Sequence, residues 1–325
     1  MSELIKLTSI KNVGELRTAI QSFPDDATLD LAIEVNLPNT DNSSERIGDA
    51  FSTMRLEPTI PKMMDFGFDM PSTVDQPVTI TKKVWEMTPE EVQQCCKEGK
   101  IKEVGSAGDT FGDGKYTYTI IGINQDIPCD SKGIPLSKDN YQDVLTVMCL
   151  GAPVGPGNGK PVEMDASKTP TGAVNTPMNS DDTNFGSWKA TAMRNTIMAQ
   201  YLAKLPANTQ KAIGYVQKVT GQCDSNTNII TGDKCFLLSG KEIFGGTGDG
   251  NGSNCTANEA SETFQYQYFA NITTSSQSRK INGSWLWLRS PHFNNSGIFC
   301  IVSNGRSNNG YAGYSGGVFP GMCVY

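Results

Sequence analysis

The chain has 325 residues, of which 37% are hydrophobic, enough for a domain of about 240 residues plus a smaller unit. Its net charge of −7 and pI near 4.9, without a cluster of Lys and Arg, exclude the usual electrostatic design of a nucleic-acid-binding protein. No apolar run reaches the length of about 18 residues that a membrane-spanning helix needs, so we expect no membrane insertion.

The first residues, MSELIKLTSI, lack the basic and long apolar regions of a secretory signal. We therefore expect a protein that stays in the cytoplasm, reaches the cell surface by a non-Sec route, or leaves on an assembled particle such as a virion. The nine cysteines are odd in number and irregularly spaced, which makes a poor disulfide framework. Cys223 and Cys235 could still pair if oxidised.

Residues 1–37 predict a small β-α-β attachment module, with a helix over 13–23 and a second strand over 29–35. Residues 38–84 are irregular. They contain turn-forming residues and then an apolar cluster over 63–70, which indicates a linker that packs internally or against a partner.

The remaining residues, 85–325, predict a single larger domain. Thr88, Pro89 and Glu91 form a capping box that opens a helix through Cys96. A second helix is predicted over 190–205, and 209–218 fits either a strand or a helix. Strands are predicted over 78–85, 115–123, 143–150, 234–238 and 285–288. This interleaving favours an α+β fold with mixed short strands and two or three helices.

The segment from Trp285 to Tyr325 has an unusual composition. Its charged side chains are Arg289 and Arg306, although charged residues make up 19% of the chain. Two apolar runs, 285–288 and 317–324, flank a stretch rich in Asn, Ser, Gly and Tyr, a composition typical of binding loops. Such a stretch lacks the apolar residues for its own core, so we expect the flanking strands to hold its backbone.

The same stretch also lacks certain residue types. From His292 to Pro320 there is no Lys, Glu, Gln, Met or Trp. Codons that end in a pyrimidine encode none of these five, and randomising the adenines of Asn codons produces such codons. The pattern therefore indicates diversified codons in this part of the gene.

These residues carry a family resemblance. The order Trp287-Leu288-Arg289-Ser290-Pro291, an Asn-rich run and Gly317-Val318-Phe319-Pro320 resembles the signature of C-type-lectin-like variable proteins diversified by retroelements. That group includes phage tail receptor-binding proteins such as the major tropism determinant. The Asn- and Trp-containing block from Met178 to Trp188 and the segment Glu242-Ile243-Phe244-Gly245 also resemble motifs of this family. The resemblance implies a C-type-lectin-like domain over 85–325, with a variable region at about 287–325 and no enzymatic activity.

The resemblance also implies which positions contact a ligand. The aromatic anchors would be Phe293, Phe299, Tyr311 and Tyr314, with Arg306 as the charged contact. Phe299 and Ile301 could instead face inward. The full set is His292, Phe293, Asn294, Asn295, Ser296, Gly297, Phe299, Ile301, Ser303, Asn304, Arg306, Asn308, Asn309, Tyr311, Gly313, Tyr314 and Ser315.

Three residues would form the scaffold of this surface: Trp285, Trp287 and Arg289. Arg289 precedes Ser-Pro at a strand end, where its guanidinium would tie loop carbonyls or a carboxylate together.

Catalytic, metal and cofactor sites are not predicted. His292 is the only histidine, so neither a catalytic triad nor a zinc site can be assembled with the usual spacing. The segment 249–254 resembles a calcium loop but has Asn254 where Gly is required. The alternative is an enzyme of the formylglycine-generating type, for which Cys300 and Cys323 are the nearest candidates although their flanks do not match.

We therefore expect a virion protein at a tail tip or fibre that binds a host-surface protein or glycan receptor. Its other partners would be phage tail proteins and, in a homotrimer, further copies of the chain. A bacterial variable binding protein with a role outside phage is the second hypothesis.

Overall fold

The computed structural model describes residues 30–31, 54–55, 82–157, 164–170, 176–245, 264–271 and 285–325. The chain divides into two compact units, Met1–Gln76 and Pro77–Tyr325. In the first unit β1 (Asp30–Leu31), inside the predicted strand 29–35, pairs antiparallel with β2 (Met54–Arg55). The rest of the predicted β-α-β module and of the irregular segment lies outside the described residues.

The second unit begins with short helices. Val84–Glu86 forms a 3-10 helix, η2, where the end of a strand was predicted, so that prediction is wrong for these residues. The capping box is confirmed: Thr88 Oγ1 accepts the Glu91 N–H and Glu91 Oε2 accepts the Thr88 N–H at 2.9 Å. It opens α2 (Pro89–Lys97), which α3 (Ile101–Val104) follows.

An antiparallel sheet forms the centre of this unit. Its strands lie in the order β3 (Thr110–Gly112), β4 (Thr117–Ile123), β5 (Leu145–Met148), β13 (Gly321–Val324) and β6 (Ile213–Gly214), and β9 (Cys235–Phe236) also pairs with β13. The strands predicted at 115–123, 143–150 and 234–238 are therefore confirmed in shorter form. The C-terminal strand β13 connects three other strands.

The helix predicted over 190–205 consists of several pieces: α4 (Ser187–Ala190), a π-helix η5 (Met193–Ile197) and α5 (Met198–Ala203). The break follows α4 because Thr191 is extended, and its hydroxyl donates to the Trp188 carbonyl at 2.9 Å. The ambiguous stretch 209–218 divides between α6 (Ala207–Ala212) and the strands β6 and β7.

A long hairpin, β7 (Val216–Gln222) and β8 (Ser225–Asp233), follows α6 and β6. The remaining helices are short: η3 (Lys138–Asn140), η4 (Ala166–Lys168), α7 (Gly240–Phe244) and α9 (Gln267–Asn271). Each α-helix of the described residues except α2 has six residues or fewer, and there are more of them than the two or three predicted. The mixed α+β class is confirmed.

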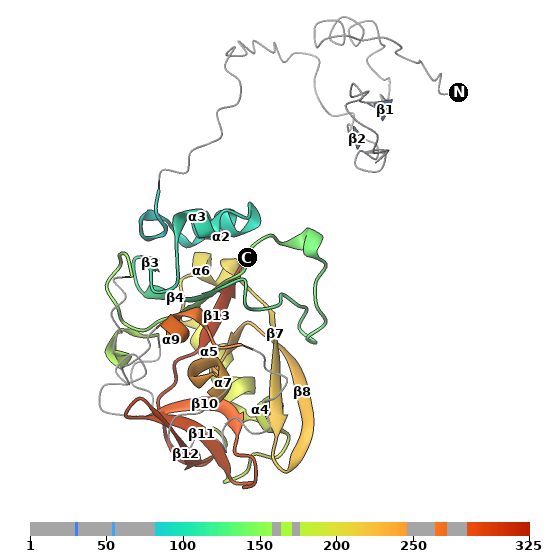
Figure 1. The fold of residues 1–325 in the computed structure, drawn as a ribbon, viewed down its shortest axis with the longest axis vertical. Coiled ribbons are helices and arrows are strands. Elements are labelled where there is room, and N and C mark those ends of the chain that lie inside the picture. The colour runs from blue at the N-terminus through green and yellow to red at the C-terminus, as the bar shows by residue number, and fades with distance from the viewer. Residues whose placement is uncertain are drawn as a thin grey trace, which may run out of the picture. The chain divides into compact units, whose positions relative to one another are not determined.

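A second antiparallel sheet contains β10 (Leu286–Pro291), β11 (Ile298–Ser303) and β12 (Arg306–Tyr311). Figure 1 shows it at the opposite end of this unit from α2 and α3. The strand at 285–288 was predicted. The polar stretch after it was expected to be a loop, but much of it forms the β11–β12 hairpin.

Two apolar clusters enclose the first two strands of this sheet. Successive side chains of a strand point to opposite faces. Trp287, Phe299 and Ile301 accordingly lie in one cluster, while Leu288 and Val302 lie in the other. Strand β12 is half exposed, because Arg306 and Tyr311 at its ends face solvent. No helix in the described part of the chain has the length and apolar character needed to span a membrane.

Candidate functional site

Many of the predicted contact positions form an exposed surface along the edge strand β12 and the three connections β10–β11, β11–β12 and β12–β13. We call the following nine exposed positions the C-terminal surface: Asn294, Asn295, Ser296, Asn304, Arg306, Tyr311, Gly313, Tyr314 and Ser315. Five more predicted positions, Phe293, Gly297, Ser303, Asn308 and Asn309, are partly exposed. Tyr311 and Tyr314 are 44% and 56% exposed, and their ring centroids are 5.4 Å apart.

Three predicted contact residues are buried, so a ligand cannot reach them in this structure. Phe299 and Ile301 are 0% and 5% exposed because they pack in the core beside Trp287. The prediction that Phe299 is an aromatic anchor is therefore wrong, whereas the inward orientation that was considered for both residues is observed. His292 is 7% exposed, and this burial lowers the pKa of its imidazole.

The turn Asn304-Gly305 connects β11 to β12 and so positions the edge strand of this surface. Ser303 pairs with Arg306, which leaves a two-residue turn, and both turn residues have positive φ, 50° and 75°. An Asn-Gly pair favours this geometry because both residue types tolerate the left-handed region. Asn-Gly is the strongest short hairpin signal in a sequence, so the signal for β11 and β12 was present but missed.

A separate loop, 179–186, holds the C-terminal surface from one side. The Asn184 side-chain amide donates to the carbonyls of Asn295 and Ile298, both at 2.8 Å, and its backbone N–H donates to Ser296 O at 2.6 Å. Asp182 Oδ1 accepts the Gly313 N–H at 2.8 Å. The loop therefore fixes the backbone of two separate parts of the C-terminal surface.

The tip of the β7–β8 hairpin binds the backbone of the C-terminal segment at a third position, Phe293. The Asp224 N–H donates to Phe293 O at 2.7 Å. The Ser187 hydroxyl donates to Gly221 O at 2.6 Å and so connects this hairpin to the end of the loop 179–186. Trp188 and Arg194 continue the connection, because both donate to the Asp233 carboxylate.

The two predicted scaffold tryptophans pack edge to face, with ring centroids 4.7 Å apart. Trp287 is fully buried, and its indole N–H donates to Thr176 O at 2.9 Å. The Trp285 ring lies against Gly316, where an added Cβ would come within 2.3 Å of a ring atom. Gly316 is therefore needed for this close approach.

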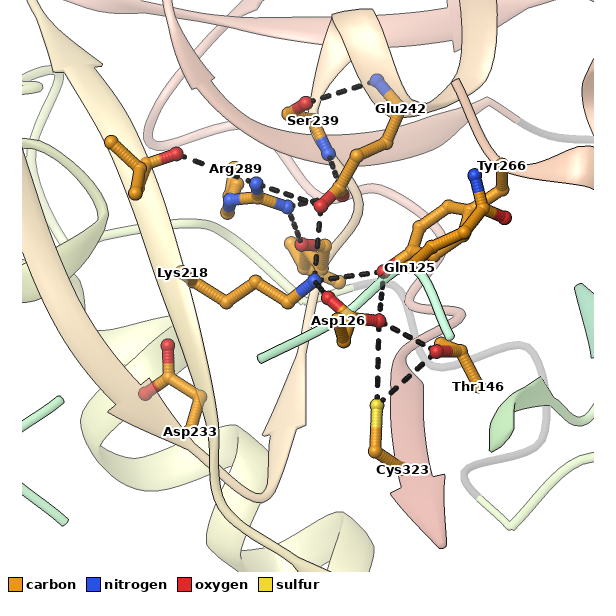
Figure 2. Close-up of polar contacts among 12 residues, drawn as sticks. Gln125, Asp126, Thr146, Lys218, Asp233, Ser239, Glu242, Tyr266, Arg289 and Cys323 are labelled. Atoms are coloured by element: carbon orange, nitrogen blue, oxygen red, sulfur yellow. Dashed lines mark hydrogen bonds and ion pairs between the residues drawn. The ribbon is translucent and has the colours of Figure 1, made fainter. Parts of the chain in front are cut away.

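A cluster of buried charged residues, which we call the buried ionic cluster, lies in the interior of the second unit (Figure 2). We define it as Asp126, Lys218, Glu242 and Arg289, together with the neutral groups of Tyr266, Thr146 and Cys323. Lys218 Nζ lies 2.5 Å from Asp126 Oδ1, 3.0 Å from Glu242 Oε1 and 2.8 Å from the Tyr266 hydroxyl. It also lies 3.7 Å from the centroid of the Phe236 ring. The two cations and two carboxylates balance in charge.

Arg289, on β10, connects the cluster to β7 and to the residues that follow β9. Its guanidinium forms a two-pronged ion pair with Glu242 and donates to Leu237 O at 2.9 Å and to Thr220 Oγ1 at 3.1 Å. Arg289 is 1% exposed. These are carbonyl and carboxylate contacts of the kind that its sequence position indicated.

The charges of the cluster stabilise one another. Burial alone would raise the pKa of Glu242, but Arg289 and Lys218 outweigh burial and lower it to about 2. Burial would likewise lower the pKa of Lys218, but the carboxylates of Asp126 and Glu242 raise it. Lys218 and Glu242 are therefore both charged at neutral pH.

Sequence reasoning missed Asp126, Lys218, Glu242 and Tyr266 as members of one cluster. The spacing of Ser239 and Glu242 contained a signal, because it forms a capping box at the start of α7. The cap places the Glu242 carboxylate in the interior, where it needs cationic partners. The other three residues lie far apart in the chain, and nothing local indicates that they meet.

The cysteines considered as nucleophiles are both fully buried. Cys300 is disulfide-bonded, and Cys323 lies 3.4 Å from Asp126 Oδ2. Burial and this carboxylate raise the pKa of the Cys323 thiol far above its usual value. Cys223 and Cys235 are free thiols, so the pairing considered for them is not formed.

Comparison with known proteins gives one match to a family model. Residues 169–325 are similar to the family described as "Domain of unknown function (DUF6273)". Neither the curated proteins nor the solved structures contain a significant match to the chain. The matched range includes the C-terminal surface, the loop 179–186, and Lys218, Glu242 and Arg289 of the buried ionic cluster.

Proposed function

We propose that this chain is a non-enzymatic ligand-binding protein with a C-type-lectin-like domain. Its C-terminal surface would carry a retroelement-diversified patch that binds a host-surface protein or glycan, and the chain would sit on a phage tail tip or fibre. A bacterial variable binding protein would use the same surface in a different setting.

The observation that carries this proposal is the contrast between side chains and backbone at the C-terminal surface. Nine predicted contact positions are exposed, while the backbone beside them is held by Asn184, Asp182 and Asp224. Side chains on such a surface can change without disturbing the core. A preordered backbone also reduces the entropy lost when a ligand binds.

The resemblance to variable lectin-like proteins gains support from the contacts between its separate motifs. Arg289 of the WLRSP block binds Glu242 of the EIFG block, and Asn184 of the upstream block holds 295–298. The three motifs thus contribute to one framework around the diversified segment.

The binding test uses the full chain, fluorescently labelled, on a broad panel of bacterial strains by flow cytometry. We expect some strains to be labelled, and Tyr311→Ala with Tyr314→Ala to reduce labelling by about tenfold or more, since exposed aromatic residues dominate binding energy. Val154→Ala, an exposed apolar change outside this surface, serves as the control. Equal labelling by all three proteins would contradict the proposal.

The diversification test is independent of the ligand. We expect DNA near the gene to contain a near-copy of the 287–325 coding region that encodes more Asn, differs at adenines and lies beside a reverse transcriptase gene. Differences scattered over all four bases would contradict this part of the proposal. Neighbouring phage structural genes would support the tail location over the bacterial one.

A further inference from the structure

Phe185 presents an aromatic ring to solvent from a tightly held backbone. Its side chain is 88% exposed, whereas Asn184 before it and Ser187 after it are 2% and 1% exposed. Asn184 bonds to 295–298 and Ser187 to Gly221, so the loop is fixed on both sides of Phe185. The ring is therefore held outside the core by its neighbours.

The backbone at Phe185 lies beside the C-terminal surface. Phe185 directly follows the residue whose N–H bonds to Ser296 O at 2.6 Å. The same loop contacts Gly313, which lies between the exposed rings of Tyr311 and Tyr314. Phe185 itself is outside the segment whose codons indicate diversification, so it would remain constant while its neighbours change.

We propose that Phe185 is a constant anchor of the ligand-binding surface, and that the ligand is a protein with an apolar pocket bordered by cationic side chains. This inference rests on the proposed function. A phenyl ring has no polar group, so it gains most from an enclosed apolar pocket. The neighbours Asp181 and Asp182 are exposed acids, and the chain carries a net charge of −7, which favours a cationic border.

Two other occupants fit this site less well. A glycan binds the face of an aromatic ring by stacking and offers no apolar cavity for a projecting side chain. A second copy of the chain would need a large apolar interface, of about 1,000 Å² or more, whereas Phe185 is bordered by Asp181, Asp182 and Ser296, all polar and exposed.

The experiment compares substitutions of Phe185 on labelled bacterial cells, with untreated, proteinase-treated and periodate-treated cells as separate probes. We expect Phe185→Ala to weaken binding by about 10- to 100-fold without a change in thermal stability, because the ring is exposed. Phe185→Leu should bind more tightly than Phe185→Tyr, since a pocket accepts an apolar side chain but not a hydroxyl. Proteinase treatment should abolish labelling and periodate should not.

The matched control is Ile134→Ala, which removes an exposed apolar side chain, 61% exposed, from a turn beside Ile230 of β8. It should bind like the unmodified chain. If Phe185→Tyr binds better than Phe185→Leu, or if periodate alone abolishes labelling, the ligand is a glycan and the inference is overturned.

The outcomes separate this inference from the proposed function. If the Tyr311 and Tyr314 substitutions weaken labelling but Phe185→Ala does not, the proposed function stands and the role of Phe185 is refuted. If no strain of the panel is labelled, both are contradicted.

Discussion

Arg289 and Arg306 are the two charged residues between Trp285 and Tyr325, and the structure places them in opposite environments. Arg289 is 1% exposed and binds Glu242 and backbone carbonyls, whereas Arg306 is exposed at the start of β12. The same residue type thus serves as an internal connector in one place and as a candidate contact in the other.

This comparison extends to the two regions around these residues. In the buried ionic cluster each charge has a defined partner, so removal of one charged side chain leaves the interior with one uncompensated charge. At the C-terminal surface the backbone is bonded to other loops and the side chains face solvent. Constraint and freedom therefore meet within one three-stranded sheet, since Arg289 lies on β10 and Arg306 on β12.

The largest expected effect is that of Arg289→Ala. The change leaves the Glu242 carboxylate without its two-pronged partner inside the protein, and we expect a loss of about 3–5 kcal/mol in the free energy of unfolding. Chemical denaturation measures it. Arg306→Ala, the matched control, should change stability by at most about 0.5 kcal/mol. Equal effects of the two changes would remove the distinction between the regions.

The second-largest effect is expected on acidification, which should lower the stability that the buried ionic cluster contributes. The pKa of Glu242 is lowered to about 2 in the folded chain from an ordinary value of 4.5. Its contribution to stability is therefore fully present above about pH 4.5 and is lost as pH falls toward 2. We expect a loss on the order of 3 kcal/mol across this window in denaturation curves. Glu242→Gln should flatten this pH dependence, and an unchanged slope in that variant would contradict the assignment.

A smaller effect is expected for Asn184→Ala, at the boundary of the two regions. Its amide holds the carbonyls of Asn295 and Ile298, so we expect a loss of about 1–3 kcal/mol. Hydrogen exchange should become faster at the Ala312 amide, which donates to Gly297 O. Asn294→Ala, an exposed change of the same type, is the control. Equal protection of Ala312 in both variants would show that Asn184 does not hold this surface.

The smallest effect is expected at the C-terminal surface itself. Asn295→Tyr and Tyr314→Ser should each change stability by no more than about 0.5 kcal/mol, because both positions are exposed. Ser307→Tyr, on the same hairpin but 3% exposed, should destabilise the fold by about 1–3 kcal/mol through overpacking. Thermal denaturation of the three variants tests whether exchangeable and fixed positions alternate as the structure indicates.

The elements with local signals could be predicted from the sequence. The Thr88 capping box predicted the start of α2, and the strand predicted over 115–123 contains β4. The helix predicted over 190–205 has a break that depends on one Thr191 hydroxyl, which periodicity does not reveal. The hairpin at 298–311 was missed because its polar composition was given more weight than the Asn304-Gly305 turn.

The candidate site was predictable only in part, for a related reason. The composition identified the segment, but strand alternation decides which side chains face outward. Phe299 and Ile301 lie on the face of β11 that packs in the core. The cluster of Asp126, Lys218, Glu242 and Tyr266 depends on contacts between residues distant in the chain. Phe185 was also missed, because its exposure follows from the burial of Asn184 and Ser187 on either side.

The position of β13 after residues 292–315 has a consequence for truncated or frame-shifted forms of the chain. This strand pairs with β5, β6 and β9, so the central sheet cannot be completed without it. A shifted reading frame or a premature stop anywhere in 292–315 removes β13. Such products would therefore fail to fold.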